Sequence, residues 1–182
     1  PSRPAGTEPS VVSPLGEDAG LRFRRGRIMH ALLQTLPDLA ADVREAAARR
    51  YVARAQHALS FEAQEEIVRE TLSVLAAPES SFLFGPGSRA EVPLVGRIDD
   101  QAISGQVDRL VVTGDAVHLV DFKSNRPAPT TVDDVPAIYL RQMALYRAAL
   151  MRIYPARRIE CYLLWTDGPR LMPLPGALLS SP

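Results

Sequence analysis

The amino-acid sequence predicts an α/β domain with a mixed central sheet flanked by helices and a helical region at its N-terminal side. Three segments before residue 78 have apolar residues at helical spacing, and short runs rich in valine, isoleucine and leucine follow them. One further helical segment separates the first three of these runs from the last two, which are short. This order of helices, a three-stranded meander, one helix and two strands is the basis of the predicted fold class.

The three N-terminal helical segments have ends that the sequence indicates. The first covers about residues 21–36 and stops at Pro37, because proline cannot continue a helix. Five apolar residues share one of its faces: Ile28, Met29, Leu32, Leu33 and Leu36. The second segment covers about residues 40–58. The third covers residues 61–76 and has Ser60 as its expected N-cap.

Five strands are expected after Pro78, each a short apolar run bounded by turn residues. They lie at about residues 89–98, 102–113, 116–123, 158–165 and 169–173. A loop rich in proline, threonine and aspartate follows the third strand, and a helix from about Pro136 to Tyr154 follows the loop. We expect the strands to form one mixed sheet.

Composition excludes several classes of protein. The chain has 182 residues, no formal net charge and 46% hydrophobic residues, which are ordinary values for one globular domain. No apolar run approaches the ~20 residues of a membrane span, so we expect a soluble, intracellular protein that does not contact a membrane. The single cysteine, Cys161, cannot form a disulfide framework, a zinc site with several cysteines or a four-cysteine iron–sulfur cluster.

The N-terminal segment is predicted to be a linker. It contains prolines at positions 1, 4, 9 and 14 and few large apolar side chains, which is typical of an extended chain. The sequence also begins without methionine, so we expect a domain from a longer protein. We divide it into a linker at 1–18 from an upstream region, a folded domain at 19–176 and a tail at 177–182.

Two predicted turns set the alignment of three acidic residues. Gly114-Asp115 suits a two-residue hairpin, and that turn places Asp108 directly opposite Asp121. If Asp99-Asp100 is also a two-residue loop, Glu91 lies opposite Asp108. This second turn has no glycine, and a slip of one residue would move Glu91 to the other face of the sheet.

Opposed carboxylates create an electrostatic problem that a cation would solve. Two like charges about 5 Å apart repel by roughly 3 kcal/mol at an effective dielectric constant of about 20. Either one carboxyl group is protonated or a cation lies between them, and oxygen ligands of this kind suit Mg²⁺ or Mn²⁺. Lys123, the only lysine of the chain, lies two residues after Asp121 and therefore on the same face. A compact ammonium group whose pKa can change suits such a site better than arginine.

The motifs together resemble those of the RecB-type PD-(D/E)XK nucleases. Asp108 lies in GQVDRL, Asp121 and Lys123 lie in VDFK, and Gln142 and Tyr146 follow on the next predicted helix. His30, in GRIMH, resembles the histidine that precedes these motifs in that group. The resemblance covers about residues 21–175 and implies a restriction-endonuclease-like PD-(D/E)XK core. It is greatest for the C-terminal nuclease domains of AddA-type helicase-nuclease subunits of alphaproteobacteria.

The resemblance implies a role for each matching residue. The implied metal ligands are Asp108, Asp121, the backbone carbonyl of Phe122 and His30, with Glu91 as a further acidic residue at the site. The implied catalytic residues are Lys123, Asp108, Asp121, Gln142 and Tyr146. Gln142 and Tyr146 would also line the DNA path. The implied reaction is hydrolysis of DNA phosphodiester bonds by a magnesium-dependent exodeoxyribonuclease.

The resemblance also implies cofactors and partners. The cofactor would be Mg²⁺ or Mn²⁺, without the iron–sulfur cluster that AddB subunits carry, because one cysteine cannot bind it. No Walker-type phosphate loop is present, so ATP is not expected to bind this part of the chain. Expected partners are DNA, with single-stranded ends favoured, an AddB-type subunit and an upstream helicase region. The setting would be double-strand-break repair in the bacterial cytoplasm.

Several of these residues have ordinary structural alternatives. Arg24, Arg25 and Arg27 could hold DNA phosphates or form a solvated helix face together with Arg22. A lone histidine such as His30 can be a packed core residue. Gln142 and Tyr146 are four residues apart, where a side-chain contact is routine.

Two other functions compete with a nuclease. A catalytically inactive, nuclease-like module could bind DNA or brace a partner subunit, although such domains usually lack a metal carboxylate or the lysine. A glycosidase also uses a carboxylate pair, but it needs an aromatic sugar platform, and this chain has one tryptophan.

Overall fold

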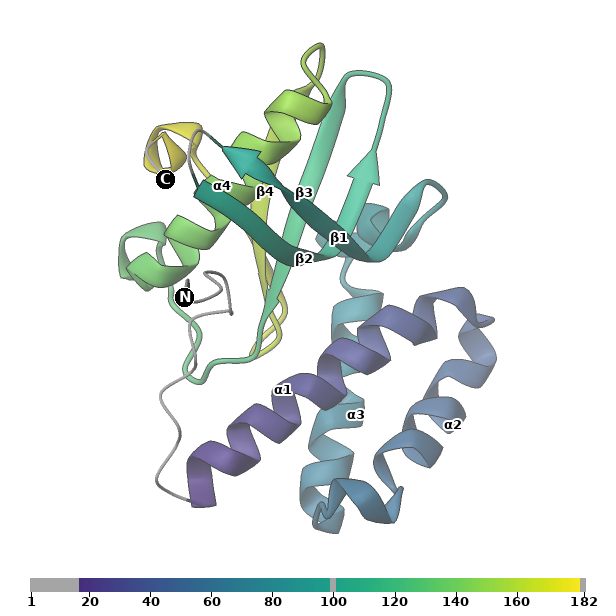
Figure 1. Ribbon diagram of the computed structural model, residues 1–182. Coiled ribbons are helices and arrows are strands. Elements are labelled where there is room, and N and C mark those ends of the chain that lie inside the picture. The colour runs from purple at the N-terminus through teal and green to yellow at the C-terminus, as the bar shows by residue number, and fades with distance from the viewer. Residues whose placement is uncertain (1–16, 99–100, 181–182) are drawn as a thin grey trace, which may run out of the picture.

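The computed structural model describes residues 17–98 and 101–180. Its main elements, in chain order, are α1 (Glu17–Thr35), α2 (Ala41–Val52), α3 (Phe61–Ala76), β1 (Ser88–Ile98), β2 (Gln101–Val112), β3 (Ala116–Lys123), α4 (Ala137–Ile153), β4 (Arg158–Trp165) and β5 (Arg170–Leu174). Five short 3₁₀ helices connect them in the described part: η1 (Leu36–Asp38), η2 (Ala55–His57), η3 (Pro78–Phe84), η4 (Val132–Asp134) and η5 (Gly176–Leu179). Helices α1, α2 and α3 form a helical layer at one end of the sheet (Figure 1).

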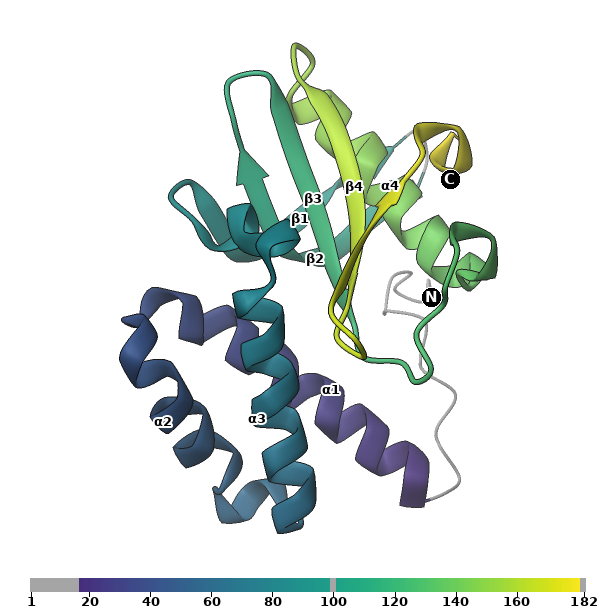
Figure 2. The same ribbon diagram turned by 180° about the vertical axis from the view of Figure 1, so that it is seen from behind.

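The predicted fold class is confirmed. The strands form one sheet in the order β1-β2-β3-β4-β5. Strands β3 and β4 run parallel, and the other neighbours run antiparallel, so the sheet is mixed. Helix α4 connects the parallel pair and lies across one face of the sheet, as the view from behind also shows (Figure 2). A crossover helix is the usual connection between parallel strands.

Most predicted boundaries are correct within about a residue, but helix α2 is shorter than predicted. The sequence pattern suggested a helix to residue 58, whereas α2 ends at Val52. The backbone of Arg54 is extended, and the chain then turns so that the buried ring of His57 packs 4.9 Å from that of Tyr51. The predicted cap of α3 is confirmed, because the Ser60 side chain accepts a hydrogen bond from the backbone N–H of Ala63.

The structure describes a helix at each boundary of the predicted domain. Helix α1 begins at Glu17, two residues inside the predicted linker, and the rest of that linker lies outside the described residues. The predicted tail contains most of η5, whose Leu179 is buried in the core beside α4. Burial of an apolar side chain, worth roughly 1.5–3 kcal/mol, accounts for the ordered turn.

Alternation along β3 assigns its two faces to different layers. Val120 and Phe122 pack in a buried cluster with Leu33 of α1, which joins the sheet to the helical layer. Leu119 belongs to a second cluster, on the side covered by α4, and Met143 of α4 belongs to the same cluster. Because successive strand residues point to opposite faces, Asp121 and Lys123 project to the α4 side.

The strand registers agree with those that the two turns predicted. In β2 and β3 the paired residues include Leu110 with Leu119, which is the alignment set by Gly114-Asp115. In β1 and β2, Ile98 pairs with Gln101 and Val92 with Val107. Within the described residues, no helix combines the length and the apolar character that crossing a membrane requires.

Candidate active site

The acidic residues lie where the regular pairing of β2 with its neighbours is interrupted. The β2–β3 ladder has Arg109 and Val120 as its last pair, so Asp108 and Asp121 occupy the next position along each strand. The Asp108 carboxylate enters this position and accepts a hydrogen bond of 2.6 Å from the backbone N–H of Phe122 to its Oδ2. The second oxygen of Asp108 therefore remains available for other partners.

The first such partner is His30 of α1. Its Nδ1 lies 3.2 Å from Asp108 Oδ1, and its ring meets the ring of Phe122 edge-on. The helical layer thus contributes one side chain to a site that is otherwise built on the sheet. His30 and Asp108 are 78 positions apart in sequence, and docking of α1 on the sheet is what brings them together.

Glu91 joins these two residues. One ligand atom from each of His30, Glu91 and Asp108 lies within 4.8 Å of the others, close enough to share a metal ion. Glu91 and Asp108 are absent from the otherwise continuous β1–β2 ladder, and Glu91 has a φ of 52°. A positive φ is uncommon for a residue with a Cβ, and β-strand irregularities of this kind redirect side chains near functional sites.

Lys123 and Asp121 form the second half of the site. Lys123 Nζ lies 2.5 Å from Asp121 Oδ2 and 3.3 Å from Gln142 Oε1. It also lies 4.0 Å from the centre of the Tyr139 ring. Gln142 in turn donates a hydrogen bond of 3.4 Å to the hydroxyl of Tyr146. The lysine side chain is therefore held from one side by β3 and from the other by α4.

Asp121 and Lys123 form a buried ion pair at 2.5 Å. Within the described part of the chain, Asp121 Oδ2 has no hydrogen-bond donor besides this ammonium group. A buried carboxylate oxygen of this kind can accept a metal ion or a hydrogen-bond donor. The sequence predicted a metal ion between Asp108 and Asp121, and in the structure the Lys123 ammonium supplies part of that positive charge. The residues close enough to share a metal ion are His30, Glu91 and Asp108.

A model of the PD-(D/E)XK nuclease superfamily matches residues 10–171. This chain belongs to that superfamily. No curated protein matches the sequence. A solved structure entitled "Crystal structure of SSO0001" aligns at 13% identity and a TM-score of 0.36, over 89% of this chain and 80% of that chain.

The PD-(D/E)XK site carries more negative charge than its own cations neutralise. Burial raises the pKa of Asp121 to about 6, and the neighbouring charge of Asp108 acts in the same direction, whereas Lys123 opposes the shift. Burial and Asp108 also raise the pKa of the Glu91 carboxyl. Both shifts arise because burial and a nearby carboxylate disfavour ionisation. A divalent cation would relieve them.

The pKa values of the two basic side chains of the site are raised as well, which for a base favours the charged form. Burial lowers the pKa of His30, but its hydrogen bond and the charge of Asp108 outweigh burial and leave that pKa raised. Burial lowers the pKa of Lys123, but the charge of Asp121 outweighs it and raises the net value. Lys123 is therefore an ammonium ion at neutral pH.

The three arginines suggested as DNA contacts differ in their surroundings. Arg24 donates to the backbone carbonyl of His57 at 3.2 Å. Arg25 is ion-paired with Glu70 of α3. Arg27 is exposed and its guanidinium lies 5.8 Å from the centre of the Phe23 ring. The structure therefore assigns intramolecular contacts to each of them.

Two residues near the PD-(D/E)XK motifs were not found from sequence. Tyr139 lies three residues before Gln142 on α4, and helical spacing of 139, 142 and 146 could have indicated their shared face. Glu70 is a buried acid in the middle of α3, flanked by buried Ile67 and Val74. A charged residue within an apolar helical stripe was the available signal.

Proposed function

We propose that this domain is a divalent-metal-dependent deoxyribonuclease that hydrolyses DNA phosphodiester bonds. The observation that carries this proposal is the buried lysine held between Asp121 and Gln142, next to a separate cluster of metal-capable side chains. A charged ammonium group beside such ligands is suited to a phosphate, since phosphoryl transfer depends on positioning and on neutralising negative charge.

The available ligand set fits a hard divalent cation. Asp108, Glu91 and His30 would hold Mg²⁺ or Mn²⁺, with Asp121 and the carbonyl of Phe122 as further oxygen ligands. A bound ion supplies Lewis acidity toward the phosphate and makes a coordinated water more acidic. The raised pKa values of Asp121 and Glu91 also support a cation site, because an added cation would favour the ionised forms of both carboxyl groups.

Lys123 would act as an acid or as a fixed positive charge rather than as a base. Its raised pKa keeps it protonated, so it donates hydrogen bonds to a phosphate oxygen or to the attacking water. Gln142 accepts from Lys123 and donates to the Tyr146 hydroxyl, which holds the amide in one orientation. The α4 residues thereby fix the direction of the ammonium group.

The order of the motifs along the chain is the basis for proposing a wider setting. We propose that the domain, at 19–176, is the nuclease part of an AddA-type helicase-nuclease and acts as an exonuclease on DNA ends during recombinational repair. It would then work in the bacterial cytoplasm with an upstream helicase region and an AddB-type subunit. His30 in α1, Asp108 in β2, Asp121 and Lys123 in β3, and Gln142 and Tyr146 in α4 support this proposal.

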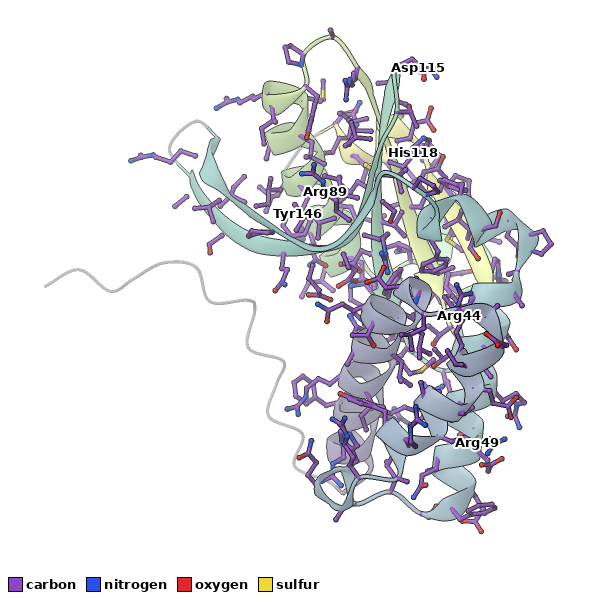
Figure 3. The ribbon with its side chains drawn as sticks, turned by 90° about the vertical axis from the view of Figure 1, so that its right-hand side faces the viewer. Arg44, Arg49, Arg89, Asp115, His118 and Tyr146 are labelled. Atoms are coloured by element: carbon purple, nitrogen blue, oxygen red, sulfur yellow. The ribbon has the colours of Figure 1, made fainter. Side chains whose placement is uncertain are left out.

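Cleavage of labelled single-stranded DNA in Mg²⁺ tests the function. Asp108→Ala and Lys123→Ala are each expected to lower the cleavage rate at least about 100-fold, because each removes a charge that the reaction needs. Asp115→Ala is the control, since Asp115 is exposed at the far end of the sheet and pairs with Arg158 (Figure 3). Full activity of both site variants would rule out the proposed mechanism.

Calorimetric titration with Mn²⁺ separates this function from an inactive DNA-binding or bracing module. The active domain is expected to bind Mn²⁺ and to lose that binding in Asp108→Ala. A module that only binds DNA would show no such site. If the domain is inactive, the wild-type protein should not cleave DNA. Lys123→Ala should then still bind DNA.

A further inference from the structure

Glu70 of α3 is a buried carboxylate with a specific set of partners. Only 8% of the residue is exposed, among apolar neighbours of the helical layer. One of its oxygens is paired with Arg25 of α1, and the other with Arg126 of the loop that follows β3. A buried carboxylate is tolerated when cations and hydrogen bonds compensate it, and these two arginines do so from different elements.

The same arginines hold the loop that leaves the active site. Arg25 Nη1 donates to the backbone carbonyl of Ser124 at 3.2 Å, and Ser124 is the residue after Lys123. Arg126 Nη1 lies 2.9 Å from Glu66 Oε1, and its Nε lies 3.7 Å from Asp167 Oδ1 in the β4–β5 turn. The start of this loop is thereby fixed to α1, α3 and the sheet.

Close packing at Gly26 supports the same contact. A Cβ on Gly26 would lie 2.9 Å from Ser124 Oγ, so any other residue there would require the Ser124 hydroxyl or α1 to shift. Gly26 lies one helical turn before His30, which is about 6 Å along the axis. The clamp of Arg25, Glu70 and Arg126 is therefore adjacent to the point where His30 meets Asp108.

We propose that the Arg25–Glu70–Arg126 clamp positions α1 against the end of β3 and so sets the placement of His30 in the metal site. These are positioning residues, because Glu70 acts on the site through α1 and the loop and touches none of its ligands. This role presupposes the nuclease function proposed above. Under this proposal, metal affinity depends on a charge network that lies outside the sequence motifs.

Mn²⁺ titration of the wild-type chain, Glu70→Gln and Glu65→Gln provides the first test. Glu70→Gln keeps the shape but removes the charge, and we expect about tenfold weaker Mn²⁺ binding, as for other groups that orient metal ligands. Glu65→Gln is the matched control on the same helix. Glu65 pairs with Arg49, which lies on the helical layer away from the sheet (Figure 3). Its substitution should leave Mn²⁺ affinity unchanged.

A double-mutant cycle with His30→Ala distinguishes positioning from general destabilisation. If the clamp acts through His30, Glu70→Gln should weaken Mn²⁺ binding much less in the His30→Ala background than in the wild type. An equal loss in both backgrounds, or no loss in the wild type, would overturn the clamp's role while leaving the nuclease function intact. Absence of Mn²⁺ binding by the wild-type chain would overturn both.

Arg126→Gln tests the clamp independently, in case Glu70→Gln does not fold. Arg126 is partly exposed, so its loss should leave the buried clusters of the helical layer and sheet in place. We expect it to weaken Mn²⁺ binding in the same direction as Glu70→Gln, with an unchanged circular-dichroism spectrum. Wild-type affinity in a folded Arg126→Gln protein would contradict the clamp.

Discussion

At the scale of single residues, the site depends on how one ammonium group is compensated. Lys123 is largely buried, and a buried cation requires partners that repay its lost hydration. Asp121 supplies a charge, Gln142 an amide oxygen and Tyr139 an aromatic face. Of these, the aromatic contact constrains where the ammonium lies without neutralising it, and under the proposed function that ammonium would face a phosphate.

Substitution of Tyr139 tests that contact. Tyr139→Phe keeps the ring, so the cleavage rate should stay within about twofold of the wild type. Tyr139→Leu removes the ring, and loss of an interaction of about 0.5–2 kcal/mol corresponds to a rate lowered about 2-fold to 30-fold. Steady-state kinetics should place this loss in kcat with little change in KM, because Lys123 acts on the reacting phosphate. Equal losses in the two variants would show that the hydroxyl, which donates to Asn125, is what matters.

At the scale of elements, a glycine in β2 fixes how closely α4 approaches the sheet. Tyr146 lies against Gly105, and a Cβ at that position would be 2.1 Å from the Tyr146 hydroxyl and 2.7 Å from its ring. Figure 3 shows Tyr146 beside the curved β1–β2 hairpin. A side chain can be added there only if the Tyr146 ring, the helix or the strand moves. The Tyr146–Gln142–Lys123 connection therefore depends on a residue that carries no functional group.

Gly105→Ala is accordingly expected to lower the cleavage rate about tenfold by displacing Tyr146 from Gln142. Gly96→Ala is the matched control, because Gly96 lies in the neighbouring strand of the same hairpin and a Cβ there meets no atom within 4 Å. Both proteins should be folded by circular dichroism. Wild-type kinetics in Gly105→Ala would show that α4 can shift without consequence for Lys123.

What the sequence could predict at this scale depends on how local each feature is. The turn at Gly114-Asp115 fixed the alignment of β2 with β3, since a two-residue hairpin leaves one register, and the alternation of β3 then placed Lys123 beside Asp121. No local sequence pattern indicated the positive φ of Glu91 or the end of α2 at Val52.

The clamp shows the same limit for charged residues. The spacing of α3 marks Glu70 as an acid on a buried face, but its partners come from α1 and from the loop after β3. Such partners are distant in sequence and are chosen by the way the layers dock. The sequence left the arginines of α1 as DNA contacts or as a solvated helix face, and their intramolecular contacts could be identified only from the structure.

At the scale of the whole molecule, the site lies at the junction of two separately packed regions. The helical layer has its own apolar cluster, built from residues such as Met29 and Ile67, and a second cluster lies between the sheet and α4. The cluster around Leu33, Val120 and Phe122 joins the two regions. His30 comes from one side of this junction and Asp108 from the other, so a metal ion held by both would link them.

A metal that binds the folded junction but not the unfolded chain must stabilise the protein. At a free concentration 100 times the dissociation constant, the gain is about 2.7 kcal/mol, which corresponds to a rise of roughly 5–10 °C in Tm for a domain of this size. Differential scanning calorimetry with Mn²⁺, against NaCl of equal ionic strength, measures this rise, and EDTA should reverse it. Asp108→Asn should show no rise, because its amide keeps an acceptor for the Phe122 N–H but loses the charge that binds the cation. The same rise in Asp108→Asn would place the ion elsewhere in the molecule.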